Sequence, residues 1–419
     1  MADSYGPPLG RPLRIGLIGS GFMAGFHVEA FRSVRDCQVT AVYSPTPDHR
    51  DALVDQVRDL GLGPCVGFDS VEEMVSGDAV DAVWIVGPNY SRVPHMVAIA
   101  AAVDHGHSTL RAVACEKPLG RNLAEARQML ELVKAAGLNH GYLENQVFAP
   151  GIRKGREILW RRAAAVSGRP YLARASEEHS GPHRPWFWVG EQQGGGVLLD
   201  MMCHSVEVAR FMLTEPGAPR SSVVASTATG HVATLKWSQP TYADLLRQTM
   251  GDEVDYLRRP SEDTAHGVIE LHDEMGQLLM VEASTSWAYV GPGLRLAIEV
   301  LGPEYSMKLD SLSTGLQVYL SRQVTGSAGE DMVEKQNAEQ GLLPVLDDEA
   351  VAYGYVAENR HMVEAFSLGV APEETWADGV AVVELLMGLY RSAEARRTIT
   401  FADEDLSAYI PAVARPEDG

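Results

Sequence analysis

The N-terminal third of the chain alternates short apolar runs with longer amphipathic segments. The run LRIGLI, residues 13–18, leads through a glycine-rich turn into a segment with helical periodicity. Two further apolar runs, QVTAVYS and VDAVWIVGP, alternate with the helical stretches RDALVDQVRDLG and SRVPHMVAIAAAVDHG. This alternation predicts an α/β fold in which crossover helices connect the strands of a doubly wound parallel sheet.

Another helix is indicated after the strand-like run RAVACEKPLG. Asn122 followed by Glu125 three residues later is typical of a capping box, which marks the start of a helix. One stripe of this segment is apolar: Leu123, Ala126, Met129, Leu130 and Val133.

After about residue 150 the pattern changes to longer strand-like segments. Examples are RPYLARASEEHS, GVIELHDEMGQLLMVEASTSW and GLRLAIEVLGPEYSMKLD, which predict a mostly antiparallel sheet. Residues 321–350 are polar and acidic and are expected to form a surface insertion, before two helical patterns near 352–368 and 376–396. We therefore expect one domain over residues 1–149 and an α+β domain over residues 150–419.

Length and composition agree with two globular domains. A chain of 419 residues exceeds what one hydrophobic core usually holds, and its 45% hydrophobic and 22% charged residues exclude disorder of the whole. The formal net charge of −21 argues against nucleic acid as the main ligand.

The sequence also predicts the compartment. Residues 1–12 hold no apolar stretch able to act as a signal peptide, and no later run approaches the roughly 18 apolar residues of a membrane span. The four cysteines are scattered without a CxxC pair, which favours reduced, mostly buried thiols. We expect a cytoplasmic protein with no membrane partner.

The turn after the first strand has the pattern G-x-G-x-x-G/A. Gly19 permits a tight turn, Gly21 lets the backbone approach a pyrophosphate, and Ala24 allows close packing of helix and strand. The N-terminus of the helix would attract the phosphates. The pattern predicts a dinucleotide cofactor, and the alternative is a glycine turn shaped only by packing.

The second strand ends at Ser44 instead of the acidic residue that usually binds the ribose of NAD. Nothing there repels a 2′-phosphate, and Ser44, Thr46 and Arg50 are able to accept one, although they also fit an ordinary solvated turn. NAD is the expected cofactor, with NADP as an open alternative.

An apolar helix near the middle of the chain contains two ionisable residues. In GGGVLLDMMCHSVEVARFML, residues 194–213, Asp200 and His204 lie four positions apart and share one helix face. They are either a buried histidine kept neutral by its own aspartate or a pair that performs chemistry.

With CEKPLG the chain resembles a known family, that of glucose-fructose oxidoreductase, inositol dehydrogenase and MocA. The motifs agree in order: GLIGSGFMAGFH, then GPN at residues 87–89, Glu116-Lys117-Pro118, and the glycine-led helix with Asp200 and His204. The resemblance runs from about residue 13 to residue 400. It implies a Rossmann domain followed by an open-sheet domain whose exposed face supports homodimers or homotetramers.

The resemblance also implies that Lys117, Asp200 and His204 meet at the nicotinamide. Removing a hydride from an alcohol carbon requires loss of the hydroxyl proton, and an imidazole is a suitable base near neutrality. His204 takes that role, Asp200 orients the ring or holds a neighbouring hydroxyl, and the Lys117 ammonium stabilises the developing alkoxide. For Lys117 the alternative is a surface ion pair with Glu116.

The residues expected to contact the cofactor come from the turn, the second strand end, the GPN loop and the E-K-P motif. They are Gly19, Gly21, Phe22, Met23, Ser44, Thr46, Arg50, Pro88, Asn89, His95, Glu116 and Lys117.

Aromatic and imidazole side chains gather just before the central helix, in EEHSGPHRPWFWVGEQQGGG. Such groups suit a sugar ring, because its C–H face stacks while its hydroxyls need polar partners. The alternative is that the aromatic rings pack under a loop. The candidate substrate residues are His179, His183, Trp186 and Trp188, with Tyr142 and Asn145 from GYLENQVFAP.

His179 and His183, with Glu177 or Glu178 beside them, also raise the question of a metal site. The intervening Gly181-Pro182 forbids a regular helix, so the spacing gives no geometric support and no metal is expected.

These features predict an NAD(P)-dependent oxidoreductase that acts on a ring hydroxyl of a sugar or glycoside, with C3 of a pyranoside favoured. The small carbohydrate substrate and further copies of the chain are the expected partners. Three alternatives stay open: a cyclitol dehydrogenase, an enzyme that cleaves glycosides by transient oxidation and elimination, and a cofactor-binding protein without catalysis.

Overall fold

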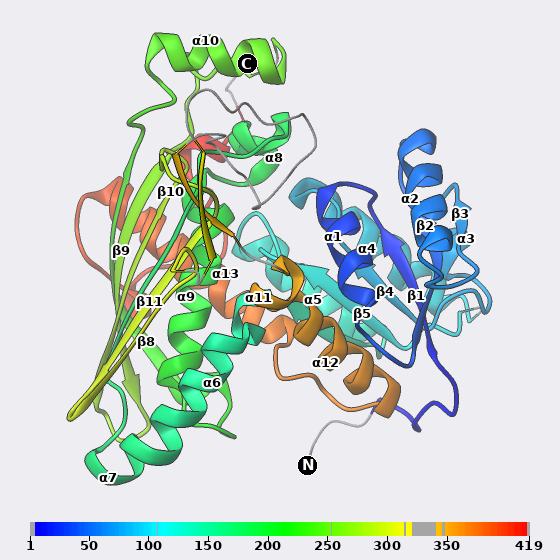
Figure 1. Cartoon of the computed structure of the whole chain (residues 1–419), viewed down its shortest axis with the longest axis horizontal. Coiled ribbons are helices and arrows are strands. Elements are labelled where there is room, and N and C mark those ends of the chain that lie inside the picture. The colour runs from blue at the N-terminus through cyan, green and yellow to red at the C-terminus, as the bar shows by residue number, and fades with distance from the viewer. Residues whose placement is uncertain are drawn as a thin grey trace. The chain divides into compact units, whose positions relative to one another are not determined.

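The chain forms two compact units (Figure 1). In this computed structural model the described residues are 5–106, 108–252, 254–313, 316–320, 341–345 and 348–416. The first unit combines Met1–Ala149 with Tyr353–Val383, and the second combines Pro150–Ala352 with Glu384–Gly419. The range 150–419, expected as one domain, is therefore divided between the two units.

The first unit is built on a six-stranded parallel sheet in the order β3-β2-β1-β4-β5-β6. Its strands are β1 (Leu13–Ile18), β2 (Cys37–Tyr43), β3 (Val66–Phe68), β4 (Ala82–Ile85), β5 (Ala112–Glu116) and β6 (Asn139–Leu143). The order reverses between β1 and β4, and such switch points are where doubly wound sheets bind ligands. The parallel sheet predicted from the alternating pattern is confirmed.

Helices connect these strands as expected. They are α1 (Phe22–Phe31), α2 (Pro47–Asp59), α3 (Val71–Val75), α4 (Arg92–Asp104) and α5 (Leu123–Ala135). The Asn122 side chain caps α5 by accepting the Glu125 N–H at 3.0 Å, whereas Glu125 accepts the N–H of Arg121 instead of that of Asn122. The predicted start of α5 is confirmed. The capping box differs from the usual one, because the Glu125 side chain binds the N–H one residue before the N-cap.

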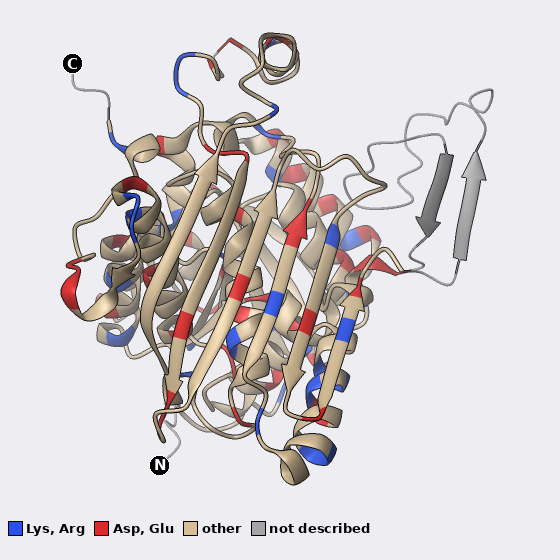
Figure 2. Cartoon of the chain, turned by 90° about the vertical axis from the view of Figure 1, so that its left-hand side faces the viewer, with Lys and Arg blue, Asp and Glu red and all other residues tan. Residues whose placement is uncertain are grey.

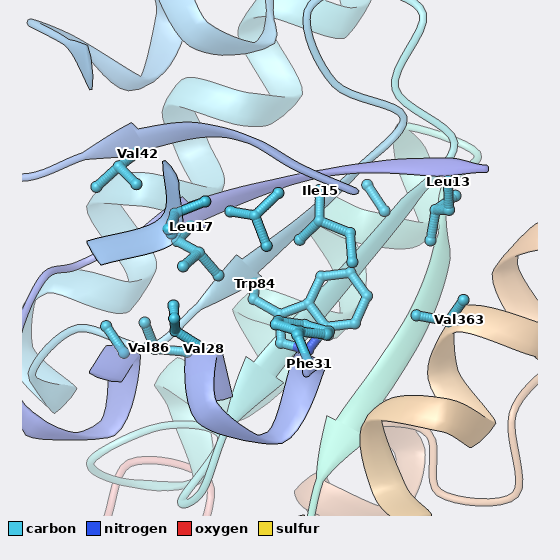
Figure 3. Packing of buried hydrophobic residues seen from close by; sticks show 14 of the residues in the cluster. Leu13, Ile15, Leu17, Val28, Phe31, Val42, Trp84, Val86 and Val363 are labelled. Atoms are coloured by element: carbon cyan, nitrogen blue, oxygen red, sulfur yellow. The ribbon is translucent and has the colours of Figure 1, made fainter. Parts of the chain in front are cut away.

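The core of this unit explains why a late helix belongs to it. Alternate residues of β1 pack with Phe31 and Trp84, whose rings meet edge to face with centroids 5.7 Å apart (Figure 3). Helix α12 (Tyr355–Leu368) adds Phe366, whose ring centroid lies 5.7 Å from that of Trp84. It also adds Asn359, whose Oδ1 accepts the Trp84 indole N–H at 2.9 Å. Burial of one such ring contributes about 1.5–3 kcal/mol.

The second unit is built on a seven-stranded sheet in the order β12-β11-β7-β10-β9-β8-β15. All neighbours are antiparallel except β7 and β10. The strands are β7 (Leu172–Glu178), β8 (Val223–Ala233), β9 (Thr264–Asp273), β10 (Leu278–Ser286), β11 (Arg295–Gly302), β12 (Tyr305–Asp310) and β15 (Ile399–Thr400). The mostly antiparallel sheet is confirmed.

Burial alternates along these strands, because one face of the sheet is covered and the other is open. Helix α9 (Val197–Leu213) packs on β7 and β10, and all its residues are buried. Figure 2 shows the opposite face, on which no helix formed by the described residues of this unit lies over the strands. The remaining helices are α6 (Pro150–Ile158), α7 (Ala165–Ser167), α8 (Gly190–Gln193), α10 (Pro240–Met250), α11 (Glu349–Ala352) and α13 (Trp376–Ala395).

The expected acidic insertion falls largely outside the described residues, which omit 321–340, 346 and 347. Within the predicted range, β14 (Gly341–Val345) is described, and it pairs antiparallel with β13 (Leu316–Leu320), which precedes the range. The two helices predicted after it correspond to α12 and α13. Within the described part of the chain, no helix has the length and hydropathy needed to cross a membrane.

Candidate active site

The glycine turn between β1 and α1 has the geometry that its pattern requires. Gly19 has φ +119°, and a Cβ there would lie 2.9 Å from the backbone nitrogen of Gly87. Gly21, just before α1, is different, because a Cβ built there meets nothing within 4 Å. Ala24 is fully buried, as its packing role demands. The turn therefore leaves open space beside Gly21 and the first N–H groups of α1, where a phosphate can approach.

Phe22 and Met23 begin α1, and the Phe22 side chain is exposed. At the end of β2, Ser44 is buried and accepts a hydrogen bond from the Ser20 hydroxyl at 2.7 Å and one from the Thr46 N–H at 3.4 Å. Ser44 thus ties the second strand to the glycine turn.

Arg50 is engaged by acidic neighbours. Its Nε donates to Asp51 at 2.8 Å, and its Nη1 binds the Phe68 carbonyl at 3.3 Å and the Asp69 carboxylate. A 2′-phosphate would have to replace two carboxylates, so the structural interpretation of Arg50 fits the geometry better than phosphate binding.

The loop after β4 brings further predicted cofactor residues to the same region. Pro88 precedes a short 3₁₀ turn at Asn89–Ser91, Asn89 is buried, and the His95 ring lies 5.7 Å from that of Tyr43. Burial lowers the pKa of His95 to about 4, which keeps the imidazole neutral near pH 7. Its Nδ1 is buried and finds no hydrogen-bond partner among the described residues, as expected for an atom that serves a ligand.

The E-K-P motif is held by two residues that sequence analysis did not identify. Glu116 is buried, with Oε1 3.0 Å from His27 Nε2 and Oε2 accepting the Lys117 N–H at 3.0 Å. Arg92 donates to the carbonyl of Glu116 at 2.7 Å, to that of Lys117 at 3.0 Å and to that of Pro118. Burial acts to raise the pKa of Glu116, but the hydrogen bond to His27 and the charges of His27, Lys117 and Arg92 together outweigh it, so the pKa is lowered.

The second unit carries the other part of the predicted centre. Asp200 and His204 lie on α9 and are both buried. The indole N–H of Trp287 donates to Asp200 Oδ2 at 3.3 Å, and Glu177 Oε2 lies 3.9 Å from His204 Nε2. A carboxylate at this distance stabilises an imidazolium. Trp287 was missed by sequence analysis, and Glu177 was considered only as a metal ligand.

Trp188 lies inside an aromatic cluster, which we define as Trp188, Trp237, Tyr256 and Trp287. Ring centroids of the other three lie 5.1 to 5.3 Å from that of Trp188, and the Trp188 N–H donates to the Pro182 carbonyl at 3.0 Å. This matches the alternative in which aromatic rings pack under the loop.

The remaining substrate candidates occupy different environments. Trp186 is partly exposed and stacks on Phe187, with ring centroids 3.7 Å apart, while His183 is exposed. His179 is buried, and its Nδ1 accepts the Gly181 N–H at 2.9 Å. Of the four candidates in this loop, Trp186 and His183 are therefore those with surface available to a ligand.

Tyr142 and Asn145 belong to the first unit. Tyr142 is fully buried in β6, and its N–H donates to the Glu374 carbonyl at 3.0 Å. Asn145 donates to the Tyr353 carbonyl at 2.8 Å. Both residues thus help to anchor the returning segment 353–383, and Glu144 between them is buried as well.

Known protein families match parts of both units. Residues 13–141 match the oxidoreductase family with an NAD-binding Rossmann fold, and residues 162–308 match the GFO/IDH/MocA C-terminal domain. Myo-inositol 2-dehydrogenase of Thermotoga maritima is 27% identical over 48% of this chain and 55% of its own. D-glucoside 3-dehydrogenase of Escherichia coli is 25% identical over 65% of this chain and 70% of its own. The match to the first relative thus spans little more than half of its length.

Among solved structures, GenD2 from gentamicin A biosynthesis, in complex with NAD, is 26% identical. The alignment covers 94% of this chain and 98% of GenD2, with a TM-score of 0.73. The first unit is an NAD-binding Rossmann domain, and the matches of both units show that the chain belongs to the GFO/IDH/MocA oxidoreductase family.

Proposed function

We propose that this protein is an NAD(P)-dependent dehydrogenase that oxidises a ring hydroxyl of a sugar or glycoside, with C3 of a pyranoside as the favoured position. The observation that carries the proposal is the buried pair on α9, in which a histidine lies beside one carboxylate and four residues from another. The names of the relatives support the substrate class, because one is a D-glucoside 3-dehydrogenase and another is an inositol dehydrogenase.

In the proposed reaction His204 accepts the proton of the substrate hydroxyl. The imidazolium that forms is stabilised by Glu177, and Asp200, held by Trp287, orients the ring or a neighbouring hydroxyl. The Lys117 ammonium stabilises the negative charge that develops on the oxygen. NAD(P), when bound, would supply the hydride acceptor, so the substrate would lose two electrons and two hydrogen nuclei in all.

Residues of the glycine turn, Ser44, the GPN loop and His95 would hold the cofactor. We favour NAD over NADP, because Arg50 is already bound to Asp51 and Asp69. The test is a panel of free sugars, cyclitols and aryl glycosides with each cofactor in both directions, followed at 340 nm. Net NADH formation with a glycoside is expected. A cyclitol as the sole substrate would move the assignment to the inositol class, and release of aglycone without net NADH would indicate cleavage by transient oxidation.

We also propose a homodimer or homotetramer formed through the open face of the seven-stranded sheet. Apolar side chains such as Val268 and Leu278 are exposed on its strands, and a hollow of about 600 Å³ lies over β7 to β12. Among the residues that line it, Arg174 bridges Glu282 at 2.7 Å and Glu299 at 2.8 Å. Arg174→Glu should place three carboxylates together and lower the molar mass in light scattering to that of one chain. An unchanged molar mass would exclude this face.

We also propose a cytoplasmic location, which the free thiols support.

A further inference from the structure

A buried glutamate binds the start of α9. Glu262 precedes β9 and is 4% exposed. Its Oε1 accepts the N–H of Gly196 at 3.0 Å and that of Leu198 at 3.1 Å, while its backbone carbonyl accepts the N–H of Val197 at 3.0 Å. One residue thus satisfies three successive N–H groups at a helix end that has no side-chain cap of its own.

Tyr390 of α13 completes this arrangement from another part of the unit. Its hydroxyl donates to Glu262 Oε1, and its oxygen accepts the N–H of Gly196 at 3.0 Å and that of Leu199 at 3.3 Å. The Gly196 N–H is therefore shared between the carboxylate and the phenol.

The turn before α9 requires glycine, because Glu262 and Tyr390 approach its backbone closely. A Cβ at Gly195 would lie 2.1 Å from the Tyr390 hydroxyl, and one at Gly196 would lie 2.5 Å from the Glu262 carbonyl oxygen. Gly194 has φ +99°, in the region that favours glycine. Any side chain at 195 or 196 would push Glu262 and Tyr390 away from the helix.

Two routes lead from this segment to Asp200. Along the backbone, the Gly196 carbonyl accepts the Asp200 N–H at 3.2 Å. Through Trp287, the Asp263 backbone carbonyl accepts the backbone N–H of Trp287 at 2.7 Å, and the Trp287 indole N–H donates to the Asp200 carboxylate at 3.3 Å. Residues 262 and 263 therefore help to fix both the main chain and the carboxylate of Asp200.

We infer that Glu262 and Tyr390 are positioning residues that set the orientation of α9, and with it Asp200 and His204, for the reaction. This inference rests on the proposed dehydrogenase function. Neither residue has to contact the substrate, since both act through the first turn of the helix. Burial raises the pKa of Glu262 to about 7, so an uncharged amide is a fair replacement for its carboxyl group.

The test compares Glu262→Ala, Glu262→Gln and Tyr390→Phe in the full chain. Glu262→Ala should lower kcat by about tenfold or more through misorientation of α9, with NADH affinity unchanged, because the glycine turn belongs to the other unit. Glu262→Gln keeps the acceptor oxygen and should restore kcat to within about threefold. Tyr390→Phe should lie between them.

Asp273→Ala is the matched control. Asp273 ends β9 and accepts the N–H of Met275 at 2.9 Å and that of Gln277 at 2.8 Å, as Glu262 accepts two N–H groups before the strand begins. This variant should lower the melting temperature and leave kcat intact. If Glu262→Ala, assayed well below its melting temperature, kept the wild-type kcat, the inference would be overturned. If it did not fold, an unchanged kcat in Tyr390→Phe would overturn it equally.

A measurement independent of turnover separates this inference from the proposed function. The His204 imidazole can be titrated by NMR, with its resonance assigned from His204→Asn. Glu262→Ala or Tyr390→Phe should shift its pKa by about half a unit or more, and Asp273→Ala should not. A wild type inactive on every polyol would refute the proposed function. The titration would still test the positioning role, because an unshifted His204 in both variants would refute it.

Discussion

Two buried histidines, one in each unit, show how the same sequence feature serves different ends. His27 lies in α1 and His204 in α9, each a lone imidazole in an apolar helix. His27 has Glu116 3.0 Å from Nε2 and Asn359 3.2 Å from Nδ1, so both ring nitrogens are fixed. His204 Nε2 lies 3.9 Å from Glu177, beyond a direct hydrogen bond to that residue. The first arrangement fixes a ring within the fold, whereas the second holds a carboxylate close enough to stabilise an imidazolium.

After His204, Lys117 is expected to have the largest effect on turnover. Its backbone belongs to the firmly held E-K-P motif, but its ammonium has the chemical role. Lys117→Ala should lower turnover by about 10²-fold or more with NADH still bound, since the charge matters mainly where an alkoxide develops. Steady-state kinetics and fluorescence titration of NADH measure the two effects. Near-normal turnover would assign Lys117 to structure.

His27 should affect stability instead of chemistry. His27→Ala leaves the buried Glu116 carboxylate without its imidazole partner and should lower the free energy of unfolding by about 2 kcal/mol or more. Urea denaturation measures this loss, and kcat of the folded fraction should stay within about threefold of wild type. A large fall in kcat without loss of stability would erase the contrast between the two histidines.

The start of α1 separates cofactor binding from folding. Gly21→Val meets open space and should fold normally, yet it should weaken NADH binding by about tenfold or more, because its side chain lies where the pyrophosphate is expected. Gly19→Val is the contrasting variant, since its positive φ and the nearby Gly87 predict a loss of stability. Unchanged NADH affinity in folded Gly21→Val would remove the cofactor from this turn.

The last effect concerns the pH dependence of stability. The pKa of Glu262 is raised in the folded chain to about 7, so its contribution to stability is complete below about pH 4.5 and is lost as pH rises through 7. The slope is at most about 1.4 kcal/mol per pH unit in that window. His95, whose pKa is lowered, acts with the opposite sign, so the comparison must be with Glu262→Gln. This variant should remove the Glu262 slope, and identical pH dependences would contradict the assignment.

Much of the first unit could be predicted because its signals are local. Alternating apolar runs give the parallel sheet, the glycine spacing gives the turn, and Asn122 marks a helix start. The return of α12 could not be predicted, since an apolar stripe such as Met362, Val363 and Phe366 does not say which core it will join.

The site shows the same limit. His27 could have been found by the reasoning applied to His204, because it too is an ionisable residue in an apolar helix. Glu262 could not, because it stands in the polar stretch RRPSEDT and only the tertiary hydrogen bonds that compensate its burial reveal it. Trp188 was expected to contact the substrate. Its packing inside the aromatic cluster could not be predicted, because the three rings around it come from distant segments of the chain.

The central claim, that α9 carries the base, is tested most directly by the pH dependence of kcat in His204→Ala, Asp200→Asn and the double variant. His204→Ala should lose about 10²-fold or more and the limb that titrates near neutrality. Asp200→Asn should lose less and add little to His204→Ala, because orientation has no value once the base is gone. Lower melting temperatures with wild-type kcat and pH profile in the folded fraction would contradict the claim and make the pair structural.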